Sequence, residues 1–263
     1  MQRVFEGALI ARVATIARIK RVKARYILMS APMVRSTLDD SKNQTRRIVS
    51  PQPAADEVIK VLSKTKQDDG EFALSMWLAY PQGESISREK NSAITSPYGI
   101  RGDHLLVKES AWMWCERVPF GKTPKGRPKW SYQPMKGAPI FYAADHPEKP
   151  QQMIASPHTG NEWGWRFKVG RFIPGWAVRI ELEVQGVRIE RLHDITDEDA
   201  WAEGIDTSEA LSMGCTEGAA RAAYSALWER IHGEGSWDVN PWVWVVIFRR
   251  LPGAPMVGKK GLN

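Results

Sequence analysis

The stretch PWVWVVIFRRL, residues 241–251, carries no polar residue between Trp242 and Phe248. β-Branched and aromatic residues favour strands, because their side chains pack well on a pleated surface. A strand that is apolar at successive positions has no side to turn toward water, so it must be covered on both faces. The stretch therefore predicts a buried strand inside a sheet.

A second strand is predicted by AVRIELEVQGVRIERL, residues 177–192, in which apolar and charged residues alternate. Successive side chains of a strand point to opposite faces, so this alternation is typical of a strand with one buried and one solvated face. Gly186 is expected to break the strand, and a second strand is expected to continue beyond it. The predicted buried face carries Val178, Ile180, Leu182 and Val184, and the solvated face carries Arg179, Glu181 and Glu183.

Two helices are predicted between these strands. In DITDEDAWAEGI, residues 194–205, Thr196 suits the capping position, acids follow in the first turn, and Gly204 ends the helix. The second helix is predicted from about residue 217 to residue 232, where Gly233 stops it. Its apolar stripe at helical spacing consists of Ala220, Ala223, Tyr224, Leu227, Trp228 and Ile231.

The first part of the chain begins with YILMSAPMVRSTLDD, residues 26–40, which predicts a short strand followed by a short helix. DSKNQTRR, residues 40–47, is then expected to be a basic turn. Residues 50–97 are rich in proline and polar residues and are expected to form a long loop with one buried piece, FALSMWLAY.

Two short strands are predicted further along, one after the Gly102-Asp103 turn and one in APIFYAAD, residues 138–145. Residues 117–139, with five prolines and four lysines, are expected to form an excursion, and an irregular run is expected from there to about residue 170. Strands dominate this order, with two helices before the last strand. The predicted fold class is therefore α+β, a small β-barrel or strongly curved sheet with flanking helices and irregular insertions.

The charge is concentrated at the N-terminus. The chain has 263 residues and a net charge of +7, of which residues 1–25 contribute +6. This basic segment resembles a transit peptide, and an upstream start codon with Met29 or a nearby residue as the functional beginning is the alternative. In either case residues 1–25 are expected to lie outside the fold. The nearly neutral remainder means that anion binding there must depend on local clusters of bases.

Several classes of site are not predicted. No window approaches the 18 or more apolar residues that a membrane-spanning helix needs, so a soluble protein with no membrane partner is expected. Cys115 and Cys215 form no CxxC pair, which argues against a disulfide framework and agrees with a reducing cytoplasm. The five histidines show no metal-binding spacing, and no glycine-rich phosphate loop is present, so neither a metal nor a cofactor is expected.

Four blocks in order carry a resemblance to a known family. The chain resembles phage and prophage proteins that contain an ASCH domain, a relative of the PUA RNA-binding fold, over roughly residues 27–250. The resemblance implies a PUA-like small β-barrel spanning residues 26–252, with insertions at about 50–97 and 117–170 and a tail at 253–263. It also implies the cytoplasm of a bacterial host. The four blocks are SAPMVRSTLDDSKNQTRRIV, PYGIRGDHLLVKESAW, WAVRIELEVQGVRIERLHDITDEDAWAEGI and GSWDVNPWVWVVIFRR.

The resemblance also implies a set of site residues. ASCH domains carry a Gly-x-Lys-x-x-Thr-x-Arg signature, and DSKNQTRR supplies Lys42, Thr45 and Arg47. Asp40 stands in place of the glycine, and aspartate tolerates a left-handed backbone better than most residues. In small bacterial members that hydrolyse acetylcytidine, the lysine and threonine work with a glutamate, which matches Glu203 here.

These residue types suit amide hydrolysis, which needs an activated nucleophile. Thr45 would supply the hydroxyl, and Lys42 would take its proton if burial lowered the pKa of its amine. Glu203 would orient Lys42 or move protons to the leaving amine. Lys42 and Thr45 would share one side of a helical turn, whereas a strand would separate them. Arg46 or Arg47 would suit a phosphate or a base edge.

Aromatic and basic residues indicate a second kind of contact with nucleic acid. Trp163, Trp165 and Trp176 lie near arginines in the sequence, among them Arg179, and such interleaving can form a stacking platform for unpaired bases. The same tryptophans can equally belong to the core. Glu109 is expected to be an exposed carboxylate paired with a neighbouring base.

Three functions remain open at this point. The first is recognition of a nucleic acid or modified nucleoside, RNA or a single-stranded base, without chemistry. The second is an amidohydrolase that deacylates a modified cytidine with Lys42, Thr45 and Glu203. The third is a phage accessory or morphogenesis protein that acts through a protein partner.

Overall fold

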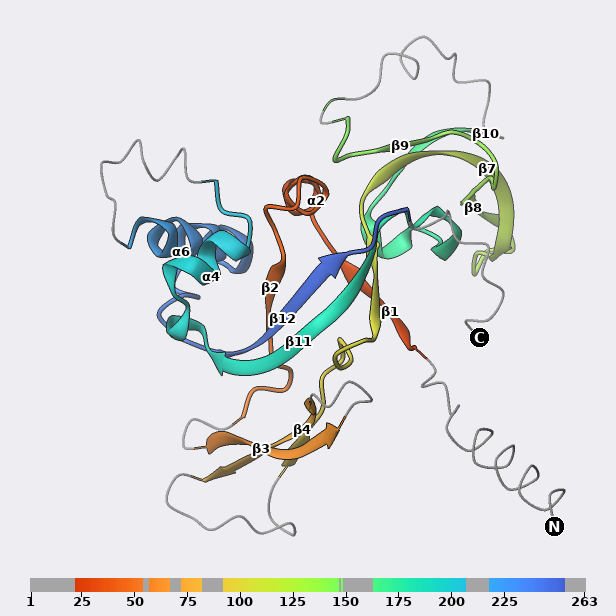
Figure 1. Cartoon of the computed structure of the whole chain (residues 1–263). Helices are drawn as coiled ribbons and strands as arrows, with labels where there is room; N and C mark the ends of the chain where they lie inside the picture. The colour runs from red at the N-terminus through yellow and green to blue at the C-terminus, as the bar shows by residue number, and fades with distance from the viewer. Residues whose placement is uncertain are drawn as a thin grey trace, which may run out of the picture.

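The computed structural model describes residues 22–53, 57–66, 72–81, 92–146, 148, 163–206 and 218–253. Within them the chain is mixed α+β and consists mostly of strands (Figure 1). The largest sheet has five strands in the order β1-β6-β11-β12-β2. These are β1 (Ala24–Leu28), β6 (His104–Lys108), β11 (Glu181–Arg191), β12 (Trp242–Arg250) and β2 (Gln44–Ile48).

The prediction for residues 241–251 is confirmed, because β12 lies between β11 and β2 and is covered on both faces. Trp244 and Val246 belong to one core cluster, which also contains Val34. Val243 and Val245 point the other way, into a second cluster with Tyr224 and other residues. The side chains of this apolar run therefore pack alternately into two separate hydrophobic cores.

The strand predicted at residues 177–192 is also present, but it is not broken at Gly186. β11 runs through this position and pairs antiparallel with β12, with a β-bulge between Val184 and Gly186. A bulge adds one residue to one strand and bends it without ending the pairing. Val178 and Ile180 are buried as predicted, although the strand begins only at Glu181.

The helices agree with their sequence signals. They are α2 (Ala31–Leu38), α4 (Asp197–Ala202) and α6 (Ala219–His232), with short 3-10 turns η1 (Gly170–Phe172), η2 (Gly175–Ala177) and η3 (Leu192–Asp194). The Thr196 side chain accepts a hydrogen bond from the backbone N–H of Asp199, as a capping residue should. Val34 of α2 joins the first core cluster, whereas Ala200 of α4 and Tyr224 of α6 join the second, so helices cover both faces of the sheet. No helix in the described ranges is long and apolar enough to cross a membrane.

The prediction of a long loop at residues 50–97 is wrong. This region contains β3 (Glu57–Lys66), β4 (Phe72–Pro81) and β5 (Ser92–Ile94), which form a separate antiparallel sheet in the order β3-β4-β5. The prolines misled the prediction because they lie at the ends of these strands and not within them. Pro53 precedes β3, Pro81 is the last residue of β4, and Pro97 follows β5.

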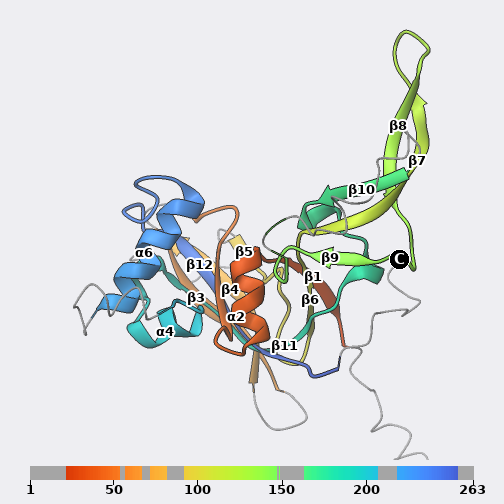
Figure 2. The same cartoon turned by 90° about the horizontal axis from the view of Figure 1, so that it is seen from above.

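The expected excursion at residues 117–139 and the irregular run to residue 170 are also corrected. β7 (Ala111–Lys122) and β8 (Pro128–Pro134) form an antiparallel hairpin, and β9 (Ile140–Tyr142) and β10 (Trp163–Lys168) pair with β7. Two of the prolines are the terminal residues of β8, where they interrupt no strand. The β7–β8 hairpin extends well away from the rest of the molecule (Figure 2).

The sheets are open. β1 and β2 are the two edges of the five-stranded sheet, so these strands do not close into the barrel that was expected. β1 begins at Ala24 and pairs in parallel with β6, and the Arg25 guanidinium lies 2.8 Å from the Asp103 carboxylate. The last two residues of the expected N-terminal extension therefore belong to the sheet, and residues 1–21 lie outside the described residues.

Candidate functional site

The residues expected to form a basic turn form a turn followed by a strand. Asp40, in place of the signature glycine, has a left-handed backbone with φ +62°, as its residue type allows. Lys42 then forms an isolated antiparallel bridge with Glu203, just before β2 begins. The Lys42 N–H donates to Ser36 O at 2.8 Å, and the Asn43 N–H donates to Ala202 O at 3.0 Å. Backbone pairing thus fixes the end of α4 against the start of β2.

The Lys42 and Glu203 side chains meet within this bridge. Lys42 Nζ lies 2.6 Å from Glu203 Oε2 and 2.8 Å from the Glu203 carbonyl oxygen. Their side chains are only 1% and 3% exposed. Burial lowers the pKa of the Lys42 amine, and the negative charge and hydrogen bond of Glu203 partly oppose this shift. The structure therefore brings together two of the three residues predicted for catalysis.

Arg46 holds the other side of the Glu203 carboxylate. Its side chain is fully buried, and its guanidinium lies 3.5 Å from Glu203 Oε1, 2.7 Å from Asp199 Oδ2 and 2.5 Å from Glu190 Oε1. Arg188 adds ion pairs to Glu190 and Asp199. Three carboxylates therefore surround the Arg46 guanidinium, which also borders the cavity beside Lys42 and Glu203. Contact of Arg46 with nucleic acid stays a prediction.

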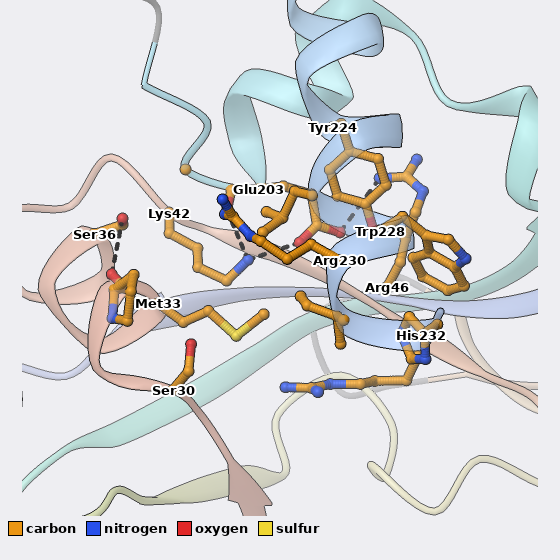
Figure 3. A pocket seen from close by; sticks show the side chains of 15 residues that line it. Ser30, Met33, Ser36, Lys42, Arg46, Glu203, Tyr224, Trp228, Arg230 and His232 are labelled. Atoms are coloured by element: carbon orange, nitrogen blue, oxygen red, sulfur yellow. Dashed lines mark hydrogen bonds and ion pairs between the residues drawn. The ribbon is translucent and has the colours of Figure 1, made fainter. Parts of the chain in front are cut away.

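A cavity of about 250 Å³ opens beside this pair (Figure 3). Lys42, Glu203 and Arg47 contribute charged groups to its wall, and Tyr224 and Trp228 contribute rings from α6. The Trp228 indole Nε1 is buried without a hydrogen-bond partner among the described residues. The remaining lining residues come from α2, from the last two turns of α6 and from three further positions: Pro32, Met33, Ser36, Leu227, Arg230, Ile231, His232, Ser30, Arg46 and Gly204.

Gly204 allows the close approach that forms one end of this cavity. Its φ is +79°, and a Cβ atom at this position would lie 2.7 Å from Ser36 Cβ and 3.0 Å from Lys42 Cβ. Both distances are below ordinary carbon contact, so α2, Lys42 and the end of α4 can meet only if this residue has no side chain. The glycine read as a helix terminator therefore also shapes the site.

A second, more open depression of about 320 Å³ borders the first. The two share Ser30, Met33, Arg47 and Ile231. Arg47 thus lies between the two cavities. Its Nη2 donates a hydrogen bond of 2.7 Å to Leu28 O, and its buried Nε has no hydrogen-bond partner among the described residues. The second depression is basic, because its lining also includes Lys108 and Arg171.

Thr45 is not brought into the cavity. It lies in β2 opposite Val246, and strand alternation turns it to the other face from Arg46. Thr45 is absent from the cavity lining, and its buried Oγ1 has no hydrogen-bond partner in the described part of the chain. Of the three residues predicted for catalysis, Lys42 and Glu203 therefore meet in the cavity wall, whereas the Thr45 hydroxyl lies outside it.

Arg179 and Trp176 line neither cavity. Arg179 forms ion pairs with Glu109 at 2.7 Å and with Asp145, and its guanidinium lies 4.0 Å from the centre of the Tyr142 ring. Trp176 is partly buried against a third core cluster. Glu109 is paired as predicted but is buried rather than exposed; burial raises the pKa of its carboxyl, and Arg179 opposes that shift.

Some site residues were not predicted from the sequence. Tyr224 and Trp228 were identified only as core positions of a helix, and the carboxylates around Arg46 had no signal beyond the acidic first turn of α4. No group of three or more histidine, cysteine, aspartate or glutamate side chains within the described ranges is arranged to hold a metal ion. In comparisons with known proteins, no family model, no curated protein and no solved structure matches the chain.

Proposed function

We propose that this protein recognises a nucleoside, free or as an unpaired base of a nucleic acid, in the cavity beside Lys42 and Glu203. The resemblance to ASCH-domain phage proteins, with their PUA-like fold, motivates the choice of ligand. The open β-rich sheet and the position of Lys42, Arg47 and Glu203 around one cavity support the proposal.

The observation that carries it is the buried Lys42–Glu203 pair in a cavity wall. A buried ion pair contributes little net stability, because desolvation offsets much of the attraction between its charges. Here the pair faces a space of about 250 Å³, just below the usual size of small-molecule pockets of about 300–1,000 Å³. That size suits a ligand with one base and excludes a much larger one.

The wall offers the contacts that a base requires. The carboxylate of Glu203 accepts hydrogen bonds and the amine of Lys42 donates them, so the pair matches a base edge that has an amino group beside a carbonyl or ring nitrogen. Tyr224 and Trp228 provide rings for stacking or edge contact. Arg47 and the second depression, with Lys108 and Arg171, supply positive charge for a phosphate attached to the nucleoside.

Isothermal titration calorimetry with cytidine, uridine, adenosine and guanosine, and with their 5′-monophosphates, tests the proposal. We expect at least one nucleoside to bind with one-to-one stoichiometry, and its monophosphate to bind more tightly. Ile231→Trp should abolish binding by filling the space that Ile231 borders. Val239→Trp, at another exposed apolar position that lines neither cavity, is the matched control and should bind as the unmodified protein does.

Deacylation of a modified cytidine is the second candidate function. The observation that favours it is the contact of 2.6 Å between Lys42 Nζ and Glu203 Oε2 in the cavity wall, where burial lowers the pKa of the Lys42 amine and so makes it easier to deprotonate. In this reaction the Thr45 hydroxyl would attack the amide carbonyl while Lys42 takes its proton, and Glu203 would help to pass that proton to the leaving amine. The C–N bond would break and leave the acyl group as an ester on Thr45, which a water molecule would then hydrolyse to free acid and the free Thr45 hydroxyl. The position of Thr45 outside the cavity lining weighs against this chemistry and is the reason that binding is the first proposal.

Hydrolysis of a panel of N4-acylated cytidines separates the two functions. The hydrolase is supported if the protein releases free acid and if Lys42→Met, Thr45→Val and Glu203→Gln each abolish that release while the variant remains folded by circular dichroism. Binding of the same compounds without turnover, by a folded protein, would leave recognition as the function and exclude this trio as a catalyst of deacylation.

A further inference from the structure

The β10-β7-β8 sheet has two faces of different character. On one face Ala111, Met113 and Cys115 of β7 are buried in the third core cluster. On the other face, β7 presents Trp112 and Trp114, which are only partly buried. The strand register then decides which side chains of the neighbouring strands share that second face.

Aromatic residues occupy the neighbouring positions on the second face. Trp165 lies directly opposite Trp114, and Phe167 lies directly opposite Trp112. Residues directly opposite each other in an antiparallel pair point to the same side, so the rings form a continuous row. The ring centroids of Trp114 and Trp165 are 5.3 Å apart, and those of Trp112 and Phe167 are 5.2 Å apart. We call these residues the aromatic face: Trp112, Trp114, Phe141, Trp163, Trp165 and Phe167.

The aromatic face is accessible. Trp163 is 47% exposed and Phe167 is 46% exposed. The face also carries one acidic residue, Glu116, which lies opposite Trp163, so its positive charge must come from the neighbouring hairpin. Exposed rings on adjacent strands are typical of surfaces that bind a partner, because a monomer gains nothing from leaving such apolar area in water.

The hairpin next to this face is strongly basic. From Arg117 to Ala144 the sequence has six lysines and arginines and no aspartate or glutamate. None of the six forms an ion pair with a carboxylate that the structure describes. Four of them, which we call the basic tip, lie exposed at the end of the hairpin: Lys122, Lys125, Arg127 and Lys129.

Aromatic rings also accompany the cations at the tip. Phe120 is 69% exposed and Trp130 is 47% exposed. The Arg117 guanidinium lies over the Trp130 ring, 4.1 Å from its centre. This stack lies on the opposite side of the hairpin from Trp112 and Trp114, because Arg117 is at an alternate position of β7 and Trp130 pairs with Pro119. It therefore does not belong to the aromatic face.

We propose that the aromatic face and the basic tip together bind single-stranded nucleic acid. Unpaired bases expose their flat faces for stacking on tryptophan and phenylalanine, and the negative charge of the sugar-phosphate backbone is attracted to the cations of the tip. A duplex hides the faces of its bases, so it can use the cations but not the rings. This surface lies apart from the cavity and does not depend on the proposed function of the cavity.

Fluorescence anisotropy with labelled oligonucleotides of about 20 nucleotides, longer than the usual site size of such surfaces, tests the proposal in the full-length protein. We expect single-stranded DNA or RNA to bind at least tenfold more tightly than a duplex of the same length. The logarithm of the binding constant should fall linearly with the logarithm of the salt concentration. Equal affinity for the duplex would overturn the stacking part of the proposal.

Two sets of variants separate the rings from the charges. Replacing all four basic-tip residues with glutamine should reduce the magnitude of the salt slope by up to about 3, since each phosphate contact on a single strand contributes about 0.7. Trp163→Ala and Phe167→Ala should each weaken single-strand binding about tenfold and leave the salt slope unchanged. The tip residues are exposed, so their replacement tests the proposal even if a ring variant fails to fold.

The N-terminal bases provide the matched control. Replacing Arg12, Arg18, Lys20 and Arg21 with glutamine removes the same charge from another part of the sequence. If this control lowers affinity and salt slope as much as the tip variant does, net charge alone explains the binding and the proposal is wrong. The basic-tip variant should bind free nucleosides in the cavity as the unmodified protein does, because none of its four replaced residues lines that cavity. A failure of the cavity and a failure of this surface are therefore distinguishable.

Discussion

Lys42 Nζ and Glu203 Oε2 lie 2.6 Å apart although the two residues are 161 positions apart in the sequence. Both side chains are almost completely buried, and Arg46 contacts the other oxygen of the same carboxylate at 3.5 Å. The pair also joins α4 to β2 through backbone pairing. The site is therefore both a connection between distant elements and the charged part of a cavity wall.

Breaking this pair should be costly. Lys42→Met leaves the Glu203 carboxylate buried without its nearest partner, and Glu203→Leu leaves the Lys42 ammonium in the same state. Each should lower the free energy of unfolding by about 3–5 kcal/mol, as for other buried ion pairs. Urea unfolding measures the change.

The double variant Lys42→Met/Glu203→Leu supplies the control. Its free energy of unfolding should fall by less than the sum of the two single decreases, with a coupling energy of about 1–3 kcal/mol, because neither charge is left buried without a partner. The exposed Arg249–Glu183 pair, with Arg249 63% exposed, should show a coupling of at most about 1 kcal/mol in the same cycle. If the decreases in unfolding free energy for Lys42→Met and Glu203→Leu were simply additive in the double variant, the two side chains would not interact and the ion pair would be refuted.

Gly204→Ala should destabilise the protein through two separate effects. The left-handed backbone, with φ +79°, costs a residue with a Cβ atom about 1–2 kcal/mol. The contacts with Ser36 and Lys42 should add about 1–3 kcal/mol of overpacking. Gly126→Ala isolates the first effect, since Gly126 has φ +77° and its added Cβ would meet nothing within 4 Å. Equal losses in urea unfolding for the two variants would refute the close approach at Gly204.

Asp199 should make stability depend on acid pH. Burial alone would raise the pKa of its carboxyl, but the hydrogen bond from Gln44 and the charges of Arg46 and Arg188 outweigh burial and lower it. A carboxyl with a lower pKa in the folded state stabilises the fold above its unfolded pKa of about 3.9, and loses this contribution as the pH falls through the folded pKa.

Asp199→Asn should therefore destabilise the protein at pH 7, and the difference from the unmodified protein should shrink below about pH 4. Urea unfolding at pH 7 and at several acid pH values measures both curves. A difference that stays constant down to the lowest pH would show that the charge of Asp199 is not the source of its contribution.

Thr45→Val should be neutral or stabilising, by up to about 1–2 kcal/mol, because it removes a buried hydroxyl without a described partner. Thr37→Val is the matched change, since Thr37 is also buried but donates to Met33 O at 2.8 Å. It should cost about 1 kcal/mol, the usual net value of a hydrogen bond. A large loss of stability at Thr45 would show that its hydroxyl has a partner in the folded protein.

The elements predicted correctly are those with a local signal. The run from Trp242 to Phe248 decides that β12 is covered on both faces, and Thr196 and Gly204 mark the ends of α4 within a few positions of the sequence. The prediction for residues 50–97 was wrong because proline was taken as a sign of a loop, whereas Pro81 is the last residue of a strand. Proline disrupts the interior of a sheet, and its effect at a strand end is small.

The site was predictable in part. The positions of Lys42, Thr45 and Glu203 came from the resemblance, and the meeting of Lys42 with Glu203 depends on how α4 and β2 pack. No local pattern specifies that Arg46 would be enclosed by carboxylates from β11 and α4, because ion pairing between distant elements is decided by the tertiary fold. For the same reason the sequence did not predict that Arg179 would form ion pairs with Glu109 and Asp145.

The most direct test of the central claim is a nucleoside titration followed by NMR of ¹³C-methyl-labelled methionine. Met33 borders both cavities, whereas Met135 lines neither and is exposed beside β8. A nucleoside in the cavity should shift the Met33 methyl signal in a saturable manner, through the ring current of its base, and leave Met135 unchanged. If no nucleoside or nucleoside monophosphate shifts Met33, or if both signals move together without saturation, the cavity does not recognise a nucleoside.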